Sequence, residues 1–199
     1  MKKFVLAITG ATGSAVGLRV LRELARSSEV HMLISDQSFS IIREETGVDW
    51  SGGTEEIQEK IRQYAGSGNI YYYAATNFEA PVASGSFKTD GMFVVPCSMK
   101  SLSGISNGYA NSLIERAADV SLKEGRPLLL APREMPFSAI HLENMLKLAR
   151  LGVKIAPPVV GFYYGPNSLE DMIDFLAGKV LDAMGVENDI FKRWGTGKE

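Results

Sequence analysis

The sequence predicts an α/β fold in which helices cover a mainly parallel, doubly wound sheet. Short apolar runs alternate with amphipathic helical segments, which is typical of a parallel sheet. Two of these runs end in turns of small residues, as strands do at a ligand-binding edge. The length of 199 residues, with 45% hydrophobic content, fits one domain. We therefore expect a single domain over residues 1–185 and a C-terminal tail over residues 186–199.

The first strand is expected over residues 4–9, and it runs into the turn Gly10-Ala11-Thr12-Gly13-Ser14. The helix that follows is amphipathic, with apolar residues from Val16 to Leu24. Backbone N–H groups at such a helix start are well placed to bind a phosphate, so a phosphorylated ligand is the first hypothesis. The alternative is a turn that uses glycine only for its tight geometry.

Further buried strands are expected over residues 29–34, 70–73, 92–97, 127–132 and 153–156. Helices are expected from 36 to about 45, from 54 to 64 with Thr54 as cap, and over 111–124, 138–151 and 168–184. Ser168 and Asp171 have the spacing of a capping box. The polar stretch 47–69 carries no predicted chemistry, whereas the long loop over residues 77–86 is of a kind that is often functional.

A second turn of small residues, Ser98-Met99-Lys100-Ser101, follows the fourth strand. Parallel strands end at one edge of a sheet, so the two turns predict a ligand crevice there. Arg133 and Glu134 come directly after the fifth strand and are expected at the same edge. A surface ion pair between them is the alternative interpretation.

Charge and cysteine content narrow the function classes. The net charge of −2 does not favour nucleic acid or an anionic membrane as partner. The lone Cys97 excludes an internal disulfide, and the absence of a Cys/His cluster of metal-binding type fits a protein of the reducing cytoplasm. No segment approaches the roughly 18 consecutive apolar residues of a membrane span.

Three further signals do not favour the chemistry that each one suggests. The first turn resembles that of nicotinamide-dependent reductases, but the next glycine is Gly17, Ser35 stands where a ribose-binding acid is expected, and no Tyr-x-x-x-Lys pair occurs. The Glu170–Asp174 segment has the spacing of a magnesium-diphosphate motif, yet carboxylates also favour a helix start, and a second acidic cluster is missing. His31, His141 and Cys97 are expected to be packed residues.

Six segments, in this order, resemble the UbiX-type flavin prenyltransferases over nearly the whole chain: Gly10–Gly13, Ala83–Ser86, Cys97–Lys100, Ile114–Val120, Pro132–Pro136 and His141–Met145. The resemblance implies a flavodoxin-like (Rossmann-type) three-layer sandwich that binds FMN. It implies transfer of a dimethylallyl group from dimethylallyl monophosphate to N5 and C6 of reduced FMN, without a metal. The prenylated FMN would serve a UbiD-type decarboxylase.

The resemblance also implies roles for individual residues and an assembly. The residues expected to hold FMN are Gly10, Ala11, Thr12, Ser35, Ser98, Met99, Lys100, Ser101 and Arg116. Those expected around the prenyl phosphate are Lys123, Arg133, Tyr163 and Lys179, with Thr12 nearby. Phe78 and Trp194 are expected to face the allylic cation, and Glu134 is expected to act in proton transfer. A cytoplasmic homododecamer with sites shared between subunits is expected, its C-terminal tail packing on the site or on a neighbour.

Three positions depart from the family pattern, and two alternative functions stay open. Thr12 replaces a common serine, Lys179 an arginine and Phe78 a tryptophan of some relatives. An FMN-dependent cysteine-type decarboxylase would need an early catalytic histidine and a Pro-Ala-Ser-Ala-Asn-type loop, whereas residues 81–86 read PVASGS. A non-catalytic FMN carrier would leave the cationic residues and Glu134 without a role.

Overall fold

Six parallel strands form the centre of this computed structural model, which describes residues 1–195. The strands are β1 (Lys2–Ile8), β2 (Ser28–Ile34), β3 (Ile70–Ala74), β4 (Gly91–Cys97), β5 (Leu128–Pro132) and β6 (Lys154–Ile155). The helices are α1 (Ser14–Ala25), α2 (Asp36–Thr46), α3 (Thr54–Ala65), α4 (Met99–Ser106), α5 (Leu113–Lys123), α6 (Ala139–Arg150) and α7 (Leu169–Ala183), with one 3-10 turn at Pro81–Ala83. The predicted α/β class is confirmed.

The strand order β3-β2-β1-β4-β5-β6 reverses direction beside β1. The chain moves outward from β1 to β2 and β3, then returns to the other side of β1 for β4 and β5. In such sheets the crevice between the two directions, at the carboxyl ends of the strands, is the place where ligands bind. The first and second predicted turns follow β1 and β4, so the topology places them side by side at this crevice.

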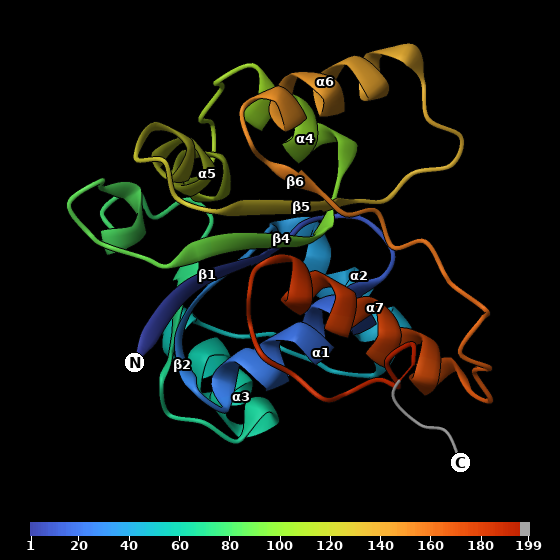
Figure 1. Cartoon of the computed structure of the whole chain (residues 1–199). Coiled ribbons are helices and arrows are strands. Elements are labelled where there is room, and N and C mark those ends of the chain that lie inside the picture. The colour runs from blue at the N-terminus through green and yellow to red at the C-terminus, as the bar shows by residue number, and fades with distance from the viewer. Residues whose placement is uncertain (196–199) are drawn as a thin grey trace.

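Both faces of the sheet are covered, because the strands are apolar on both sides. Helices α1, α2, α3 and α7 lie on one face, and α4, α5 and α6 lie on the other (Figure 1). Alternate residues of β1 therefore enter different cores: Leu6 packs with the α1 and α7 side, and Ala7 with the α4 and α5 side. The three-layer arrangement that the resemblance implied is confirmed.

Two local expectations were wrong. The turn after β4 is the start of a helix, because Ser98 accepts a hydrogen bond from Ser101 N at 3.2 Å and caps α4. Gly53, not Thr54, is the N-cap of α3, and no side chain caps that helix. The capping box of Ser168 and Asp171 at the start of α7 is confirmed.

The segment after α7 folds back along that helix as far as residue 195. Asp182 accepts hydrogen bonds from Asn188 Nδ2 at 2.9 Å and from Arg193 at 2.7 and 2.9 Å. The Phe191 ring meets the Phe175 ring edge-on at 5.4 Å. Residues 196–199 of the predicted tail lie outside the described residues. Across residues 1–195, none of the helices has the length and apolarity needed to cross a membrane.

Candidate functional site

Hydrogen bonds connect the segments that follow four neighbouring strands at the carboxyl edge of the sheet. Ser98 N donates to Thr9 Oγ1 at 2.7 Å, which joins the turns after β4 and β1. Ser35 N donates to the Ile8 carbonyl at 3.0 Å, and Arg133 N donates to the last carbonyl of β4 at 3.1 Å. The turns after β1, β2, β4 and β5 therefore share one framework, as the motif positions predicted.

A polar cavity of about 560 Å³ lies between these turns and the start of α5. Most of the predicted FMN residues line it: Gly10, Ser35, Ser98, Met99, Lys100 and Ser101. The first residues of α4 and α5 both line the cavity, and helix N-termini carry partial positive charge. At the start of α5 the Glu115 carboxylate already accepts hydrogen bonds from Asn111 N and Ser112 N, and Asp36 lines the cavity as well. Lys100 and the N-terminus of α4 are therefore the groups that suit the cavity to an anionic ligand.

The first turn presents donors to an anion, but a carboxylate of the chain already receives them. Gly13, at φ 99°, is the N-cap of α1 and has no side chain of its own to cap the helix. Gly13 N donates to Glu45 Oε2 at 3.0 Å, Ser14 N donates to the same oxygen at 2.8 Å, and the Thr12 hydroxyl donates to Glu45 Oε1. These donors are satisfied by Glu45 in this structure, so a ligand phosphate would have to replace that carboxylate, and a phosphate at this turn stays a prediction.

Glu45 was missed in the sequence because it lies in the last turn of α2, far along the chain from the first turn. A glycine-rich helix start does indicate an anion site, but it does not say which anion fills it. Ala11 and Thr12 belong to the turn without lining the polar cavity.

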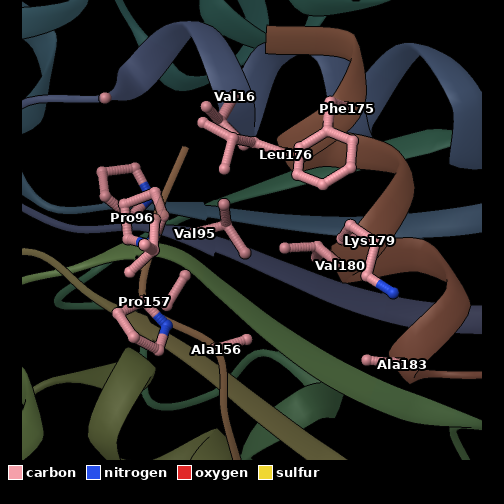
Figure 2. Close-up of a pocket in the computed structure, with 14 residues that line it drawn as sticks. Val16, Val95, Pro96, Ala156, Pro157, Phe175, Leu176, Lys179, Val180 and Ala183 are labelled. Atoms are coloured by element: carbon pink, nitrogen blue, oxygen red, sulfur yellow. The ribbon is translucent and has the colours of Figure 1, made fainter. Parts of the chain in front are cut away.

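An apolar pocket of about 330 Å³ lies at the other end of the first turn, where Gly13 lines it, and Figure 2 shows most of its walls. Its walls come from α1, β4, the segment after β6 and α7, and they include Val16, Val95, Pro96, Pro157, Leu176 and Val180. Lys179 is the one cation among its lining residues, and its amino group is directed away from Val95 and Pro96. Gly13 lines the pocket as well, so the first turn separates an apolar space from a polar one.

Two predicted residues from distant segments lie beside this pocket. The Tyr163 ring meets the Trp194 ring at 5.6 Å and the Phe175 ring at 5.8 Å, both edge-on. Phe175 lines the apolar pocket one helical turn before Lys179. Tyr163 therefore meets the middle of α7 at Phe175, one helical turn from Lys179, and Trp194 packs against Tyr163 there.

Other predicted residues are not brought to this place within one chain. Lys123 is the last residue of α5, which begins at the polar cavity and runs about 16 Å toward the other edge of the sheet. Its amino group pairs with Glu124 at 2.6 Å. Arg116 donates to the Ala83 carbonyl at 3.0 Å and pairs with Asp119 at 2.7 Å, so it lies outside the lining of the cavity.

Three predicted residues are exposed near the carboxyl edge. Phe78 follows β3 and is 47% exposed. Arg133 and Glu134 follow β5, and the Glu134 carboxylate accepts a hydrogen bond from Met135 N at 3.0 Å. These two residues do not form an ion pair with each other in the part of the chain that the structure describes. Their charged groups are therefore open to a ligand or to a neighbouring molecule.

The acidic motif on α7 has structural contacts. Asp171 accepts hydrogen bonds from Asn167 N at 2.7 Å and Ser168 N at 3.0 Å, and these bonds lower its pKa. Asp174 pairs with Arg19 and so joins α7 to α1. The prediction that this motif serves the helix start is confirmed.

His31 and Cys97 are buried, as predicted, whereas His141 is half-buried and hydrogen-bonded. Cys97 is fully buried, and burial raises the pKa of its thiol to about 12. His31 is buried and stacks on Tyr71 and Tyr73, and its Nε2 lies 2.8 Å from Glu29 Oε1. Burial lowers the pKa of His31 against the opposing effect of Glu29. His141 Nδ1 accepts a hydrogen bond from Ser138 N at 3.2 Å within a capping box.

Comparisons with known proteins agree over nearly the full length. A family model described as Flavoprotein matches residues 1–181. The flavin prenyltransferase UbiX of Methanocaldococcus jannaschii is 46% identical, with 98% of this chain and 99% of that protein covered. AnUbiX (PadA1), solved in complex with FMN and dimethylallyl pyrophosphate, is 41% identical, with a TM-score of 0.89 and 99% of each chain covered.

Two further solved structures bear on assembly and on the alternative function. A protein described as a dodecameric FMN-dependent UbiX-like decarboxylase from Escherichia coli O157:H7 is 41% identical, with a TM-score of 0.87 and coverage of 96% of this chain and 98% of its own. An FMN-dependent cysteine decarboxylase from thioviridamide biosynthesis is 13% identical at a TM-score of 0.61, with 93% and 99% covered. The second similarity shows a shared fold alone.

Proposed function

The chain belongs to the UbiX-type flavin prenyltransferases, and from this membership we infer that it is an enzyme that transfers a dimethylallyl group to FMN. The membership rests on 46% identity along the whole of a curated relative. One observation on this chain carries the inference: a polar cavity suited to an anionic cofactor and an apolar pocket with a lysine lie at the two ends of the same turn, lined by Gly10 and Gly13 respectively. A transferase needs such a pair of neighbouring spaces, one for each substrate.

FMN is assigned to the polar cavity. Lys100 and the N-terminus of α4 would meet its negative charge, while Ser35, Ser98 and Ser101 offer hydroxyl groups. Gly10 has no side chain and so allows close approach of a ligand. The neighbouring Gln37 also leaves little room for one, because a Cβ at position 10 would lie 3.3 Å from Gln37 Cβ. When bound in its reduced form, FMN would supply the nucleophilic N5 and C6 positions.

The prenyl donor is assigned to the apolar side of the turn. Lys179 and Tyr163 place a cation and a phenol beside apolar walls, an arrangement that suits a short phosphate ester. Exclusion of water by these walls would strengthen the pairing of the lysine with the phosphate. We assign dimethylallyl monophosphate as the donor, and the pyrophosphate held by AnUbiX supports a donor of this class.

Departure of a monophosphate requires cations that meet its growing negative charge. Arg133 and Lys179 are available within one chain. Lys123 lies at the other edge of the sheet, so we assign it, together with Arg116, to the site of a neighbouring copy in a homododecamer. The dodecameric relative supports this assembly.

Thr12, Glu134 and the aromatic residues complete the proposed chemistry. The Thr12 hydroxyl, which bonds to Glu45 in this structure, would turn to the departing phosphate. Phe78 and Trp194 would face the allylic cation, at about 0.5–2 kcal/mol per ring. Glu134 would accept a proton as the new ring closes, either directly or through water.

The product is proposed to leave as prenylated FMN for a UbiD-type decarboxylase in the cytoplasm. The cysteine-type decarboxylase is not favoured, because the similarity to that group is limited to the fold. An FMN carrier is not favoured either, because it has no use for a lysine at the rim of an apolar pocket.

Release of inorganic phosphate tests the proposal. Dimethylallyl monophosphate and diphosphate are each supplied to the protein with reduced FMN, and with oxidised FMN as control. We expect phosphate release from the monophosphate only when FMN is reduced. Binding of FMN without release of phosphate from the monophosphate or of pyrophosphate from the diphosphate would support the carrier instead.

A further inference from the structure

Arg126 ties a loop of the chain to the end of α5. Its Nη2 donates to the Gly85 carbonyl at 2.6 Å, and its Nη1 donates to the Phe87 carbonyl at 2.7 Å. These carbonyls belong to residues 83–87, which we call the 83–87 loop. Arg116, near the start of α5, donates to the first carbonyl of this loop at 3.0 Å. Because a planar guanidinium can bind two acceptors at once, two arginines hold the loop at three points.

The backbone at the end of α5 fixes where Arg126 begins. Gly125 follows the helix at φ 65°, and its N–H donates to the Leu122 carbonyl at 3.1 Å. Arg126 N donates to the Ser121 carbonyl at 2.8 Å. These two bonds form a Schellman motif, the helix ending that a left-handed glycine permits. The motif keeps Arg126 close to Lys123, the last residue of the helix.

The amino group of Lys123 lies against the 83–87 loop. It pairs with Glu124 Oε1 at 2.6 Å, and both charged groups lie beside Gly85. A Cβ at position 85 would lie 2.8 Å from Lys123 Nζ and closer still to Glu124 Oε1. The loop therefore forms one wall of the space that the lysine occupies, and Arg126 holds that wall in place.

We propose that Arg126 is a positioning residue for prenyl transfer, because the loop that it holds keeps the Lys123 amino group where a donor phosphate can meet it. This inference rests on the proposed function, in which Lys123 serves the site of a neighbouring copy. The Lys123 side chain is 47% exposed, and a long exposed side chain loses conformational entropy when it binds an anion. A wall that limits its positions reduces this cost before the donor arrives.

A double-mutant cycle separates positioning from general support of the fold. Phosphate release from dimethylallyl monophosphate is measured at saturating reduced FMN, for Arg126→Gln in the wild-type and in a Lys123→Ala background. We expect Arg126→Gln to lower kcat/KM at least tenfold in the wild-type background. Its effect should be less than twofold where the lysine is already absent, because the two residues act through one contact. Equal losses in both backgrounds would overturn the inference and leave the proposed function intact.

Gly85→Ala keeps the inference falsifiable if Arg126→Gln does not fold. The atoms nearest to the added Cβ are at the ends of two flexible side chains, so the fold should persist while the lysine is displaced. We expect kcat/KM to fall at least threefold at an unchanged Tm, and a wild-type kcat/KM would overturn the inference. Arg26→Gln is the control, because Arg26 is 69% exposed at the end of α1 and Arg19 still pairs with its partner Glu23. This control should keep the wild-type kcat/KM.

Hydrogen exchange tests the loop itself and needs no substrate. Amides of the 83–87 loop should exchange at least tenfold faster in Arg126→Gln than in the wild type, and unchanged exchange would overturn the inference. A wild type that releases no phosphate would overturn the proposed function and, with it, the role of Arg126 in the reaction. The exchange result would still decide whether Arg126 holds the loop, so the two failures are distinguishable.

Discussion

Replacement of Thr12 by Val removes one hydroxyl and keeps the branched shape of the side chain. Thr12 is exposed, and its hydroxyl donates to the Glu45 carboxylate beside Gly13, which lines the apolar pocket. A hydrogen bond to a charged group contributes about 1.5–3 kcal/mol. If that bond forms with the phosphate only as it departs, its loss should slow prenyl transfer by about 10- to 150-fold.

The assay is the single-turnover rate of phosphate release, measured alongside FMN affinity. FMN affinity should change less than about twofold, because Thr12 does not line the polar cavity. Thr12→Ser is the matched control, since it keeps the hydroxyl, and it should retain most of the rate. The reasoning is refuted if Thr12→Val transfers at the wild-type rate, or if the serine variant is as slow as the valine variant.

Three further changes test the fold and the site. Gly17→Ala places a Cβ about 2.2 Å from the Val95 carbonyl oxygen, so despite the gain in helix propensity it should lower the free energy of unfolding by about 1–3 kcal/mol and Tm by several degrees. The control Gly68→Ala, where a Cβ meets open space, should leave Tm unchanged. A Tm that does not fall in Gly17→Ala would contradict the close packing of α1 on β4. Burial lowers the pKa of His31 in the folded state, so its contribution to stability is present above the ordinary pKa of 6.5 and is lost as the pH falls through the folded-state pKa. Denaturant titrations should show that His31→Phe loses less stability than the wild type between pH 7 and pH 5. Equal losses in the two proteins would show that protonation of His31 does not cause the loss. Glu134→Gln should leave FMN affinity unchanged and slow ring closure at least tenfold in rapid-quench mass spectrometry, and a large loss of FMN binding would give Glu134 a structural role instead.

The sequence predicted the fold because its local signals agree with one another. Apolar strands, small-residue turns and the Ser168 capping box all indicate the same α/β topology, and each is formed by residues that are close along the chain. The cap of α3 was misplaced because Thr54 is a good cap by type, whereas the backbone at Gly53 has the extended conformation of the cap. Helix α4 was missed because serine and glycine favour turns, and burial of Leu102 and Ile105 outweighed that preference.

The site was predictable only where residues close along the chain determine it. Residues that follow strands, such as Ser35 and Ser98, are placed by topology alone, and they line the cavity. Glu45 could not be foreseen, because its approach to Gly13 depends on how α2 packs beside α1. The position of Lys123, at the edge of the sheet opposite the cavity, could be inferred only once the direction of α5 was known.

The mass of the flavin after anaerobic incubation tests the central claim most directly. The purified protein is incubated with reduced FMN and dimethylallyl monophosphate, and the extracted flavin is weighed by mass spectrometry. The account predicts a flavin heavier than FMN by one dimethylallyl unit, formed in proportion to the phosphate released. Recovery of unmodified FMN alone, from protein that binds FMN and is fully folded, would contradict it.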